Sequence, residues 1–235
     1  MNIYWMKKDF RLKDNAALNA AIKSECLIIN IFEPSVSFHY DHDIRHWRFI
    51  QQSINYLEKE GLKIHTFYGE ARNVFEYLLS EYKVDQIISH EETGNDLTYA
   101  RDLDLIELFK EKDIPWTEFQ TNAVVRGLKK RDGWDALWIK YVKSKQFEEI
   151  NTSKLQQIET SIPDHFIIPN DIAQLLDSPS ELMLHGGESK AHQMLSSFLN
   201  EKVENYWGSI SYPEKSRYFC SMLSTYITYG NLSIK

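Results

Sequence analysis

The alternation of apolar and polar positions in the first half of the chain predicts short buried strands separated by helices. Residues 3–6 and 26–32 are apolar runs of the kind found in strands that are covered on both faces of a parallel sheet. Three further strands are predicted at residues 63–68, 86–89 and 116–119. The pattern therefore predicts five strands, with an interval of helical length between each strand and the next.

Each of these intervals carries a helical pattern. The first helix is capped by Asp14 or Asn15 and ends near residue 24. The later helices repeat apolar residues at spacings of three and four, over about residues 44–61, 74–82 and 97–112. Strands that alternate with helices indicate an α/β fold with an open, five-stranded, doubly wound parallel sheet and right-handed crossovers.

The carboxyl ends of parallel strands form the ligand-binding edge of such a sheet, at the point where the strand order reverses. The loops at residues 7–13 and 90–95 follow two of the predicted strands, so both lie beside any pocket. The chain contains neither a Gly-x-Gly-x-x-Gly fingerprint nor a Gly-Lys-Ser/Thr phosphate loop. A dinucleotide-dependent dehydrogenase and a kinase-like nucleotidase are therefore disfavoured.

Composition sets the size of the core and favours one compartment. Of the 235 residues 43% are hydrophobic, which is enough for a large core, and the net charge of −7 argues against a chain that coats nucleic acid everywhere. Cys26 and Cys220 lie far apart, which indicates neither a disulfide framework nor a zinc knuckle and favours the reducing cytoplasm. Because no run of eighteen apolar residues and no secretion signal is found, we expect no membrane association.

One segment departs from the acidic average. Residues 120–147 carry seven basic and two acidic side chains, a net charge of +5, with Trp134, Trp138 and Tyr141 among them. A basic patch with interleaved aromatic residues is suited to nucleic-acid phosphates. A solvated linker helix has the same composition, so both interpretations stay open.

The next region, residues 148–185, is polar and contains several prolines. It shows only a short helical pattern, at residues 155–158, and we therefore expect an interdomain connection. A new amphipathic pattern begins after Gly187.

Two groups of titratable side chains each allow a chemical and a structural interpretation. His39, His42 and His46 recur at helical spacing, so two of them can share a face as metal ligands, but a polar helix entrance explains them better. No metal site is predicted. The His-Glu-Glu run at residues 90–92 suits acid–base chemistry only in a desolvated cleft, and a structural role in the loop is the alternative.

A set of positions near the N-terminus matches a known pattern. They are Trp5, Asp9, Arg11, Leu12, Asp14, Asn15, Ala17 and Leu18. This stretch resembles the opening of the DNA photolyase/cryptochrome family, which reads roughly Trp-Phe-Arg-Arg-Asp-Leu-Arg-Leu-x-Asp-Asn-Pro-Ala-Leu. Lys7 and Lys8 stand where arginines are usual, and Ala16 stands where proline is usual.

A second match lies about two hundred residues further on. Gly-Gly-Glu at residues 186–188 precedes a helix, Tyr206 follows, and residues 220–233 read Cys-Ser-Met-Leu-Ser-Thr-Tyr-Ile-Thr-Tyr-Gly-Asn-Leu-Ser. The same family carries similar motifs at the start of its helical flavin domain. Residues 90–95 and 131–134 also resemble one bacterial branch, so the resemblance covers the whole chain.

The resemblance implies three parts: an antenna-type, Rossmann-like α/β domain over residues 1–130, a linker over 131–185, and the start of a helical FAD-binding domain over 186–235. It implies a blue-light-dependent DNA photolyase, a carbon–carbon lyase that repairs cyclobutane pyrimidine dimers in UV-damaged DNA by electron transfer from reduced FAD. The alternatives are a cryptochrome-like photoreceptor and a non-catalytic pigment- or nucleotide-binding module.

The resemblance also implies a set of FAD contacts. These residues are Tyr206, Cys220, Ser221, Met222, Leu223 and Ser224. Met222 replaces the usual arginine and Thr225 the usual proline, which we expect to weaken the site. Because the family's flavin pocket continues beyond this motif, we expect an incomplete chain that lacks the rest of the helical domain, binds FAD poorly and is inactive alone.

Two further groups of residues are assigned on the same resemblance. Contacts to an antenna chromophore of the folate or deazaflavin type, or between the domains, are expected from Arg11, Asp14, Glu91 and Glu92. Contacts to DNA are expected from Arg126, Lys129, Lys130 and Arg131.

Overall fold

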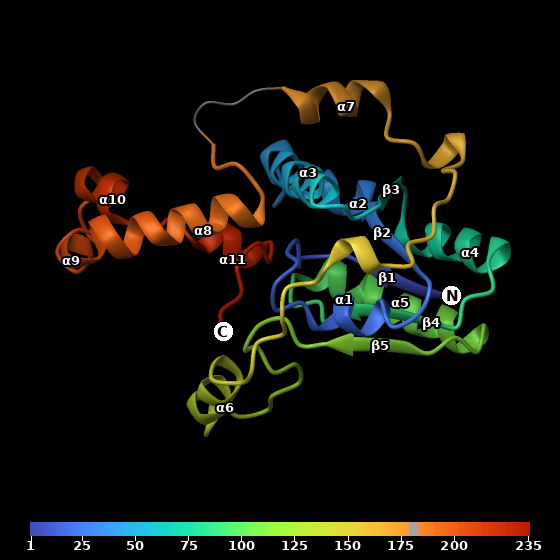
Figure 1. Cartoon of the computed structure of the whole chain (residues 1–235), viewed down its shortest axis with the longest axis horizontal. Coiled ribbons are helices and arrows are strands. Elements are labelled where there is room, and N and C mark those ends of the chain that lie inside the picture. Colours follow the sequence, from blue (N-terminus) through green and yellow to red (C-terminus); the bar gives the residue numbers. More distant parts are fainter. Residues whose placement is uncertain (179–182) are drawn as a thin grey trace.

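A computed structural model describes residues 1–178 and 183–235 and shows a five-stranded parallel sheet. The strand order is β3-β2-β1-β4-β5, so the order reverses between β1 and β4. The strands are β1 (Asn2–Trp5), β2 (Cys26–Phe32), β3 (Ile64–Tyr68), β4 (Gln86–His90) and β5 (Trp116–Phe119). The predicted doubly wound α/β sheet is confirmed (Figure 1).

Side chains of β1 alternate between two separate cores, one on each face of the sheet. Tyr4 packs with Leu18 and Ile54 in the core on the side of α1 and α3. Trp5 packs with Phe75 in the core on the side of α4 and α5, with ring centroids 5.1 Å apart. The helices around the sheet are α1 (Ala16–Ala21), α2 (Pro34–Ser37), α3 (Ile44–Lys59), α4 (Ala71–Glu81) and α5 (Asp96–Glu111).

Local hydrogen bonds fix where two of these helices begin. Asn15 is the N-cap of α1, because its side chain accepts from the backbone N–H of Leu18, 2.9 Å away. Asp43 caps α3 in a capping box with His46, which confirms the polar helix entrance predicted around the histidines. The predicted first helix is too long at its end, since α1 stops at Ala21.

The connection after β5 packs against the α/β domain. It contains α6 (Trp134–Val142), two 3-10 turns, η1 (Thr152–Lys154) and η2 (Asp164–Phe166), and α7 (Asn170–Asp177). Apolar side chains of this region complete the two cores: Ile150, Ile172 and Leu176 lie in one, and Phe166 in the other. The predicted helical pattern at 155–158 is wrong, because Gln157 forms a bridge beside Cys26. Residues 179–182 of the predicted linker lie outside the described residues.

Short helices make up the C-terminal part: α8 (Glu188–Ser197), a π-helical turn η3 (Phe198–Lys202), α9 (Val203–Tyr206), α10 (Pro213–Phe219) and α11 (Ser224–Thr228). Figure 1 shows α8, α9 and α10 projecting to one side, with α11 beside α8. A small third core joins Phe49 of α3 to Ala191, Tyr226 and Leu232. Among the residues that the structure describes, no helix has the length and apolar character that a membrane crossing requires.

Candidate ligand site at the carboxyl edge of the sheet

A cavity of about 190 Å³ lies where the strand order reverses, at the carboxyl ends of β1 and β2 and the start of α5. This is the position at which open α/β sheets bind ligands. We call it the switch-point pocket. It is lined by Trp5, Met6, Lys7, Lys8, Asn30, Ile31, Glu33, Val36, Asp41, His42, Trp47, Ile50, Glu92, Asn95, Thr98, Arg101 and Tyr229.

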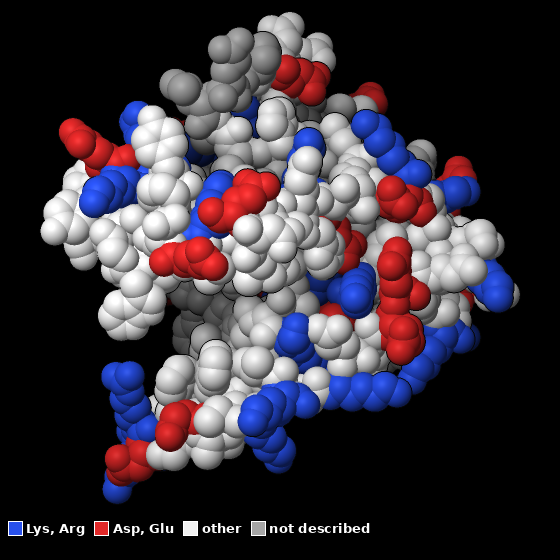
Figure 2. All heavy atoms as spheres, turned by 60° about the vertical axis from the view of Figure 1, so that its left-hand side comes forward, with Lys and Arg blue, Asp and Glu red and all other residues white. Residues whose placement is uncertain are grey.

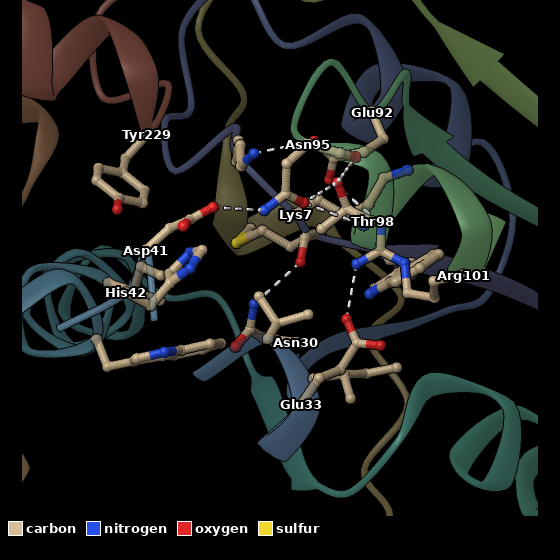
Figure 3. Close-up of a pocket in the computed structure, with 17 residues that line it drawn as sticks. Lys7, Asn30, Glu33, Asp41, His42, Glu92, Asn95, Thr98, Arg101 and Tyr229 are labelled. Atoms are coloured by element: carbon tan, nitrogen blue, oxygen red, sulfur yellow. Dashed lines mark hydrogen bonds and ion pairs between the residues drawn. The ribbon is translucent and has the colours of Figure 1, made fainter. Parts of the chain in front are cut away.

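A buried charge network forms one wall of this pocket (Figure 3). The Arg101 guanidinium donates to Glu33 at 2.6 Å, to Asp102 at 2.7 Å and to Glu92 at 3.2 Å. Burial raises the pKa of Glu33 although Arg101 opposes this effect. Because Arg101 is held by three carboxylates from different elements, the wall is rigid before any ligand enters.

Two lysines extend the network. Lys7 is buried beside Asp102, with Nζ 3.2 Å from the carboxylate, and lies over the rings of Trp5 and Trp116. Burial lowers its pKa, against the charge of Asp102. Lys8 donates to Glu92 at 2.9 Å. Burial alone would raise the pKa of Glu92, but the charges of Lys8, Arg101 and Lys7 lower it to about 2. Glu92 is therefore ionised at neutral pH.

The opposite wall presents polar atoms that have no partner. Among the described residues, Asn30 Oδ1, His42 Nδ1 and Trp47 Nε1 are buried without a hydrogen bond, and all three residues line this pocket. The Asn30 amide is oriented, because its Nδ2 donates to the carbonyl of Met6 at 3.0 Å. Buried polar atoms without partners are uncommon and costly. Their concentration here makes this pocket the candidate ligand site.

Residues from three segments surround the mouth of the pocket. Asn95 donates to Asp41 at 3.3 Å and so links the loop after β4 to the loop before α3. Tyr229 comes from the C-terminal part and lies near Asp41 and His42 in Figure 3. Trp47 stacks on Phe32, with ring centroids 3.9 Å apart, and gives the pocket an aromatic floor. The site therefore combines apolar ring surface with a few fixed polar groups.

The two sequence motifs that lie about two hundred residues apart meet in the fold. Glu188 accepts from the backbone N–H groups of Leu12 at 2.8 Å and Lys13 at 3.2 Å. Asn231 donates to the carbonyl of Phe10 at 2.9 Å and to Ser53 at 3.0 Å. These contacts hold the C-terminal segment against the loop at 7–13.

Three of the four expected antenna or domain-contact residues, Arg11, Glu91 and Glu92, line a second cavity beside the loop at 7–13, and Asp14 does not. Arg11 donates to the carbonyl of Gly230 at 2.9 Å, and Asp14 accepts from Lys235 at 3.2 Å, so both lie between the two parts of the chain. Glu92 lines the switch-point pocket, whereas Glu91 does not and instead faces Arg126 at 3.5 Å. Their assignment to a pigment stays a prediction.

The residues expected to contact FAD lie near the surface of the C-terminal helices. Cys220, Ser221 and Leu223 are half-buried, Met222 and Ser224 are exposed, and Tyr206 lies on α9 against Phe198. None of them lines the switch-point pocket. Met222 has a φ of 55°, which a side chain other than glycine adopts only at a cost. The FAD assignment of these residues stays a prediction.

The residues expected to contact DNA fall into two groups. Arg126 is held by Glu118 at 2.6 Å and by Glu91, so its charge is already paired. Lys129, Lys130 and Arg131 are exposed. Basic side chains line the lower margin of the molecule in Figure 2, on the side where α6 lies in Figure 1. Within the described ranges, no group of three or more His, Cys, Asp or Glu residues is arranged to hold a metal ion.

Several residues of the pocket were not identified from the sequence. Asn30 is a polar residue inside the apolar run of β2, and this irregularity is a signal that points to it. Arg101 and Asp102 sit in an ordinary helical pattern, so nothing in the sequence distinguishes them from surface charges. Trp47 belongs to the apolar stripe of α3, and only the fold shows that it lines a cavity and that its indole N–H has no partner among the described residues.

Comparison with known proteins relates both the sequence and the fold to one family. The sequence profile of DNA photolyase matches residues 2–133. The chain is 29% identical to cryptochrome-2 of Gallus gallus over 119 residues, which is 48% of this chain and 20% of that cryptochrome.

Solved structures share the fold over nearly the whole chain. The photolyase of Sulfolobus tokodaii, which contains two FAD molecules and implicates a novel light-harvesting cofactor, matches 99% of this chain with a TM-score of 0.73 and 20% identity. A class III photolyase from Agrobacterium tumefaciens (TM-score 0.72, 19% identity) and a Synechocystis cryptochrome (0.70, 18%) also match 99% of it. The chain spans 53%, 51% and 53% of these three proteins. Since the family profile covers more than half of its residues, this chain belongs to the DNA photolyase/cryptochrome family.

Proposed function

We propose that the protein is a blue-light-dependent DNA photolyase that repairs cyclobutane pyrimidine dimers. We further propose that its α/β domain binds a light-absorbing pigment. The observation that carries this proposal is the switch-point pocket, which is lined by three residues with unpartnered polar atoms and by Tyr229 of the segment that resembles the start of a flavin domain. A pigment in this pocket lies next to that segment.

The residues of the pocket fit a planar heterocyclic pigment of the folate or deazaflavin type. A volume of about 190 Å³ holds roughly six water molecules, which suits a fused ring system with its tail extending outside. Asn30 Oδ1 accepts a hydrogen bond from a ring N–H, and Trp47 Nε1 donates to a ring carbonyl. The neighbouring charge network fixes the wall and leaves these two groups to orient the ring.

The residues expected around FAD do not yet fit the whole cofactor. Tyr206 and residues 220–224 supply one edge of the proposed site and lie near the surface of the C-terminal helices. When bound, reduced flavin would supply the electron that opens the dimer. The C-terminal helices expose three large aromatic side chains, those of Trp207, Tyr212 and Tyr218. This exposure supports the proposal that additional helices pack against them.

Damaged DNA is the proposed macromolecular partner. Lys129, Lys130 and Arg131 are exposed and lie at the start of α6, which carries the solvent-exposed Trp138. Charges of this kind contact phosphates without reading sequence. In photolyases, the damaged bases leave the duplex at a cost of a few kcal/mol.

A cryptochrome-like photoreceptor is the second candidate function. The observation that favours it is the 29% identity to a cryptochrome over 119 residues. The third candidate, a pigment-binding module without catalysis, is favoured by Met222 at the position of the usual arginine. These candidates differ in whether light leads to repair of DNA.

The proposal is tested first by absorption spectroscopy of the purified 235-residue chain. We expect it to take up a folate or deazaflavin pigment and to retain little FAD, because its FAD residues form only one edge of a site. Stoichiometric flavin absorbance would show that these residues suffice for FAD. Failure to bind either pigment would remove the basis for an antenna pocket.

A further inference from the structure

The N-terminal end of α3 forms part of the wall of the switch-point pocket. His42 precedes this helix, Trp47 lies in its first turn, and both residues line the pocket. Asp41, next to His42, accepts from Asn95 at 3.3 Å and joins this wall to the loop after β4 (Figure 3). The position of the wall therefore depends on how firmly the first turn of α3 is held.

A capping box holds that turn, and it uses the ring of a histidine. The Asp43 side chain accepts from the backbone N–H of Arg45 at 2.9 Å. In return, the backbone N–H of Asp43 donates to Nδ1 of His46 at 3.2 Å. Glutamate or glutamine is the usual residue at this position of a capping box. Because a backbone N–H can only donate, Nδ1 of His46 must be unprotonated for this bond to form.

The surroundings of His46 oppose its protonation. Burial lowers its pKa, and the charge of Arg45 adds to this effect, whereas Asp43 acts in the opposite direction. The partial positive charge at the N-terminus of a helix also disfavours a cation there. From the C-terminal part, the ring of Tyr229 lies with its centroid 6.3 Å from that of His46 and is neutral, because burial raises its pKa to about 12.

The neighbouring His42 has the same preference for the neutral form. Its ring centroid lies 5.5 Å from that of His46, and its Nδ1 is buried without a hydrogen bond to any described residue. Burial lowers the pKa of His42, and the charges of His46 and Lys8 add to this effect. His39 acts in the same direction, whereas Asp41 opposes it. A proton on His46 therefore adds positive charge to a site that already disfavours it.

These preferences fix the sign of the pH dependence. A histidine of the unfolded chain protonates at about pH 6.5, whereas His46 of the folded chain protonates at a lower pH. The capping box therefore contributes its full stability above about pH 6.5, and this contribution falls as the pH decreases below that value. Once Nδ1 carries a proton, two N–H groups face each other and the hydrogen bond from Asp43 is lost.

We propose that the capping box of α3 is a pH-sensitive device that holds one wall of the switch-point pocket: the first turn is fixed while His46 is neutral and is released when Nδ1 is protonated in mild acid. Release frees residues 42–47, which carry His42 and Trp47 of that wall. The charge network on the opposite wall consists of arginine, lysine and carboxylate side chains. The proposal rests neither on the light-driven activity nor on the identity of a pigment.

Hydrogen exchange of the purified chain, measured by mass spectrometry, tests this proposal. Protection of the amides of residues 43–47 is compared at pH 7.5 and 5.0, after correction for the intrinsic exchange rates. His46→Gln keeps an acceptor in the capping box that does not titrate. At pH 7.5 both proteins should be protected to a similar degree. At pH 5.0 the unmodified chain should be at least about fivefold less protected than His46→Gln, as expected from the loss of one cap.

His165→Gln is the matched control, because His165 is exposed and does not line the pocket. It should lose protection at pH 5.0 as the unmodified chain does. NMR titration of His46 in the unmodified chain adds a second test, since its protonation midpoint should coincide with the loss of protection. Equal protection of the unmodified chain and His46→Gln at pH 5.0, or two different midpoints, would overturn the proposal. The comparison of midpoints still decides should His46→Gln fail to fold.

Discussion

Gly230 lies against the backbone of Lys8 so closely that a Cβ at position 230 would overlap the Lys8 carbonyl group. Gly230 also has a φ of +67°, a conformation that side chains rarely adopt. The same segment accepts a hydrogen bond from Arg11 at 2.9 Å. The glycine of the C-terminal motif is therefore required where that motif meets the N-terminal one.

Gly230→Ala tests this contact. We expect it to destabilise the chain by roughly 3 kcal/mol, because positive-φ strain of about 1–2 kcal/mol adds to the overlap with Lys8. Gly127→Ala is the control, since Gly127 has a similar φ of +72° but no atom within 4 Å of its Cβ position. Urea unfolding measures both. Equal losses of stability in the two variants would show that the close approach at Gly230 contributes nothing.

Glu92 gives the charge network a defined pH dependence. Its folded pKa of about 2 lies below the unfolded value, so its contribution to stability is complete above about pH 4.5 and disappears as the pH falls toward 2. The shift corresponds to roughly 3 kcal/mol at neutral pH. Thermal unfolding between pH 7 and 3 should show a shallower acid-side loss in Glu92→Gln than in the unmodified chain. Glu91→Gln, at the neighbouring half-buried position, should keep the original profile, and the opposite ranking would contradict this account.

The strand pattern and the order of elements could be predicted from the sequence, because buried strands and amphipathic helices leave local signals. Helix α7 was missed because its buried residues, Ile172 and Leu176, provide only one apolar pair in a polar region. The pairing of Arg126 with Glu118 was missed because side chains on β5 and on a later loop meet only in three dimensions.

The candidate site was predicted only as a location. Loops after β1 and β4 do flank the pocket, as the parallel topology requires. Asn30 and Trp47, which line it, lie within apolar patterns that the sequence assigns to the core. Which atom of a buried side chain lacks a partner depends on packing and cannot be inferred from periodicity.

Trp47→Phe tests pigment binding in the switch-point pocket. Phenylalanine keeps an aromatic ring beside Phe32 and removes the indole N–H, which has no partner in the described structure, together with part of the indole ring. We expect affinity for 5-deazariboflavin or folic acid to fall about tenfold, the equivalent of one good hydrogen bond. Fluorescence titration measures the affinity, and thermal unfolding without pigment should show little change. An unchanged affinity would mean that the indole N–H does not contact the ring.

The basic segment before α6 gives a prediction for DNA binding. Replacing Lys129, Lys130 and Arg131 by alanine should weaken binding to a dimer-containing duplex and reduce the salt slope by about 2–3. Arg126→Ala should leave the slope almost unchanged, because Arg126 is already paired with Glu118. Titrations at several salt concentrations distinguish the variants. If Arg126→Ala changes the slope as much as the triple variant does, the assignment of free and paired charges is wrong.

The proposed function of the protein is light-driven repair of DNA. The most direct measurement is dimer repair in an oligonucleotide containing one cyclobutane thymine dimer, by the protein purified from the cells that make it, under blue light and in darkness. We predict restored thymines under blue light and none in darkness. A protein that carries reduced flavin and binds the oligonucleotide but leaves the dimer intact in the light would contradict the photolyase proposal and favour the photoreceptor.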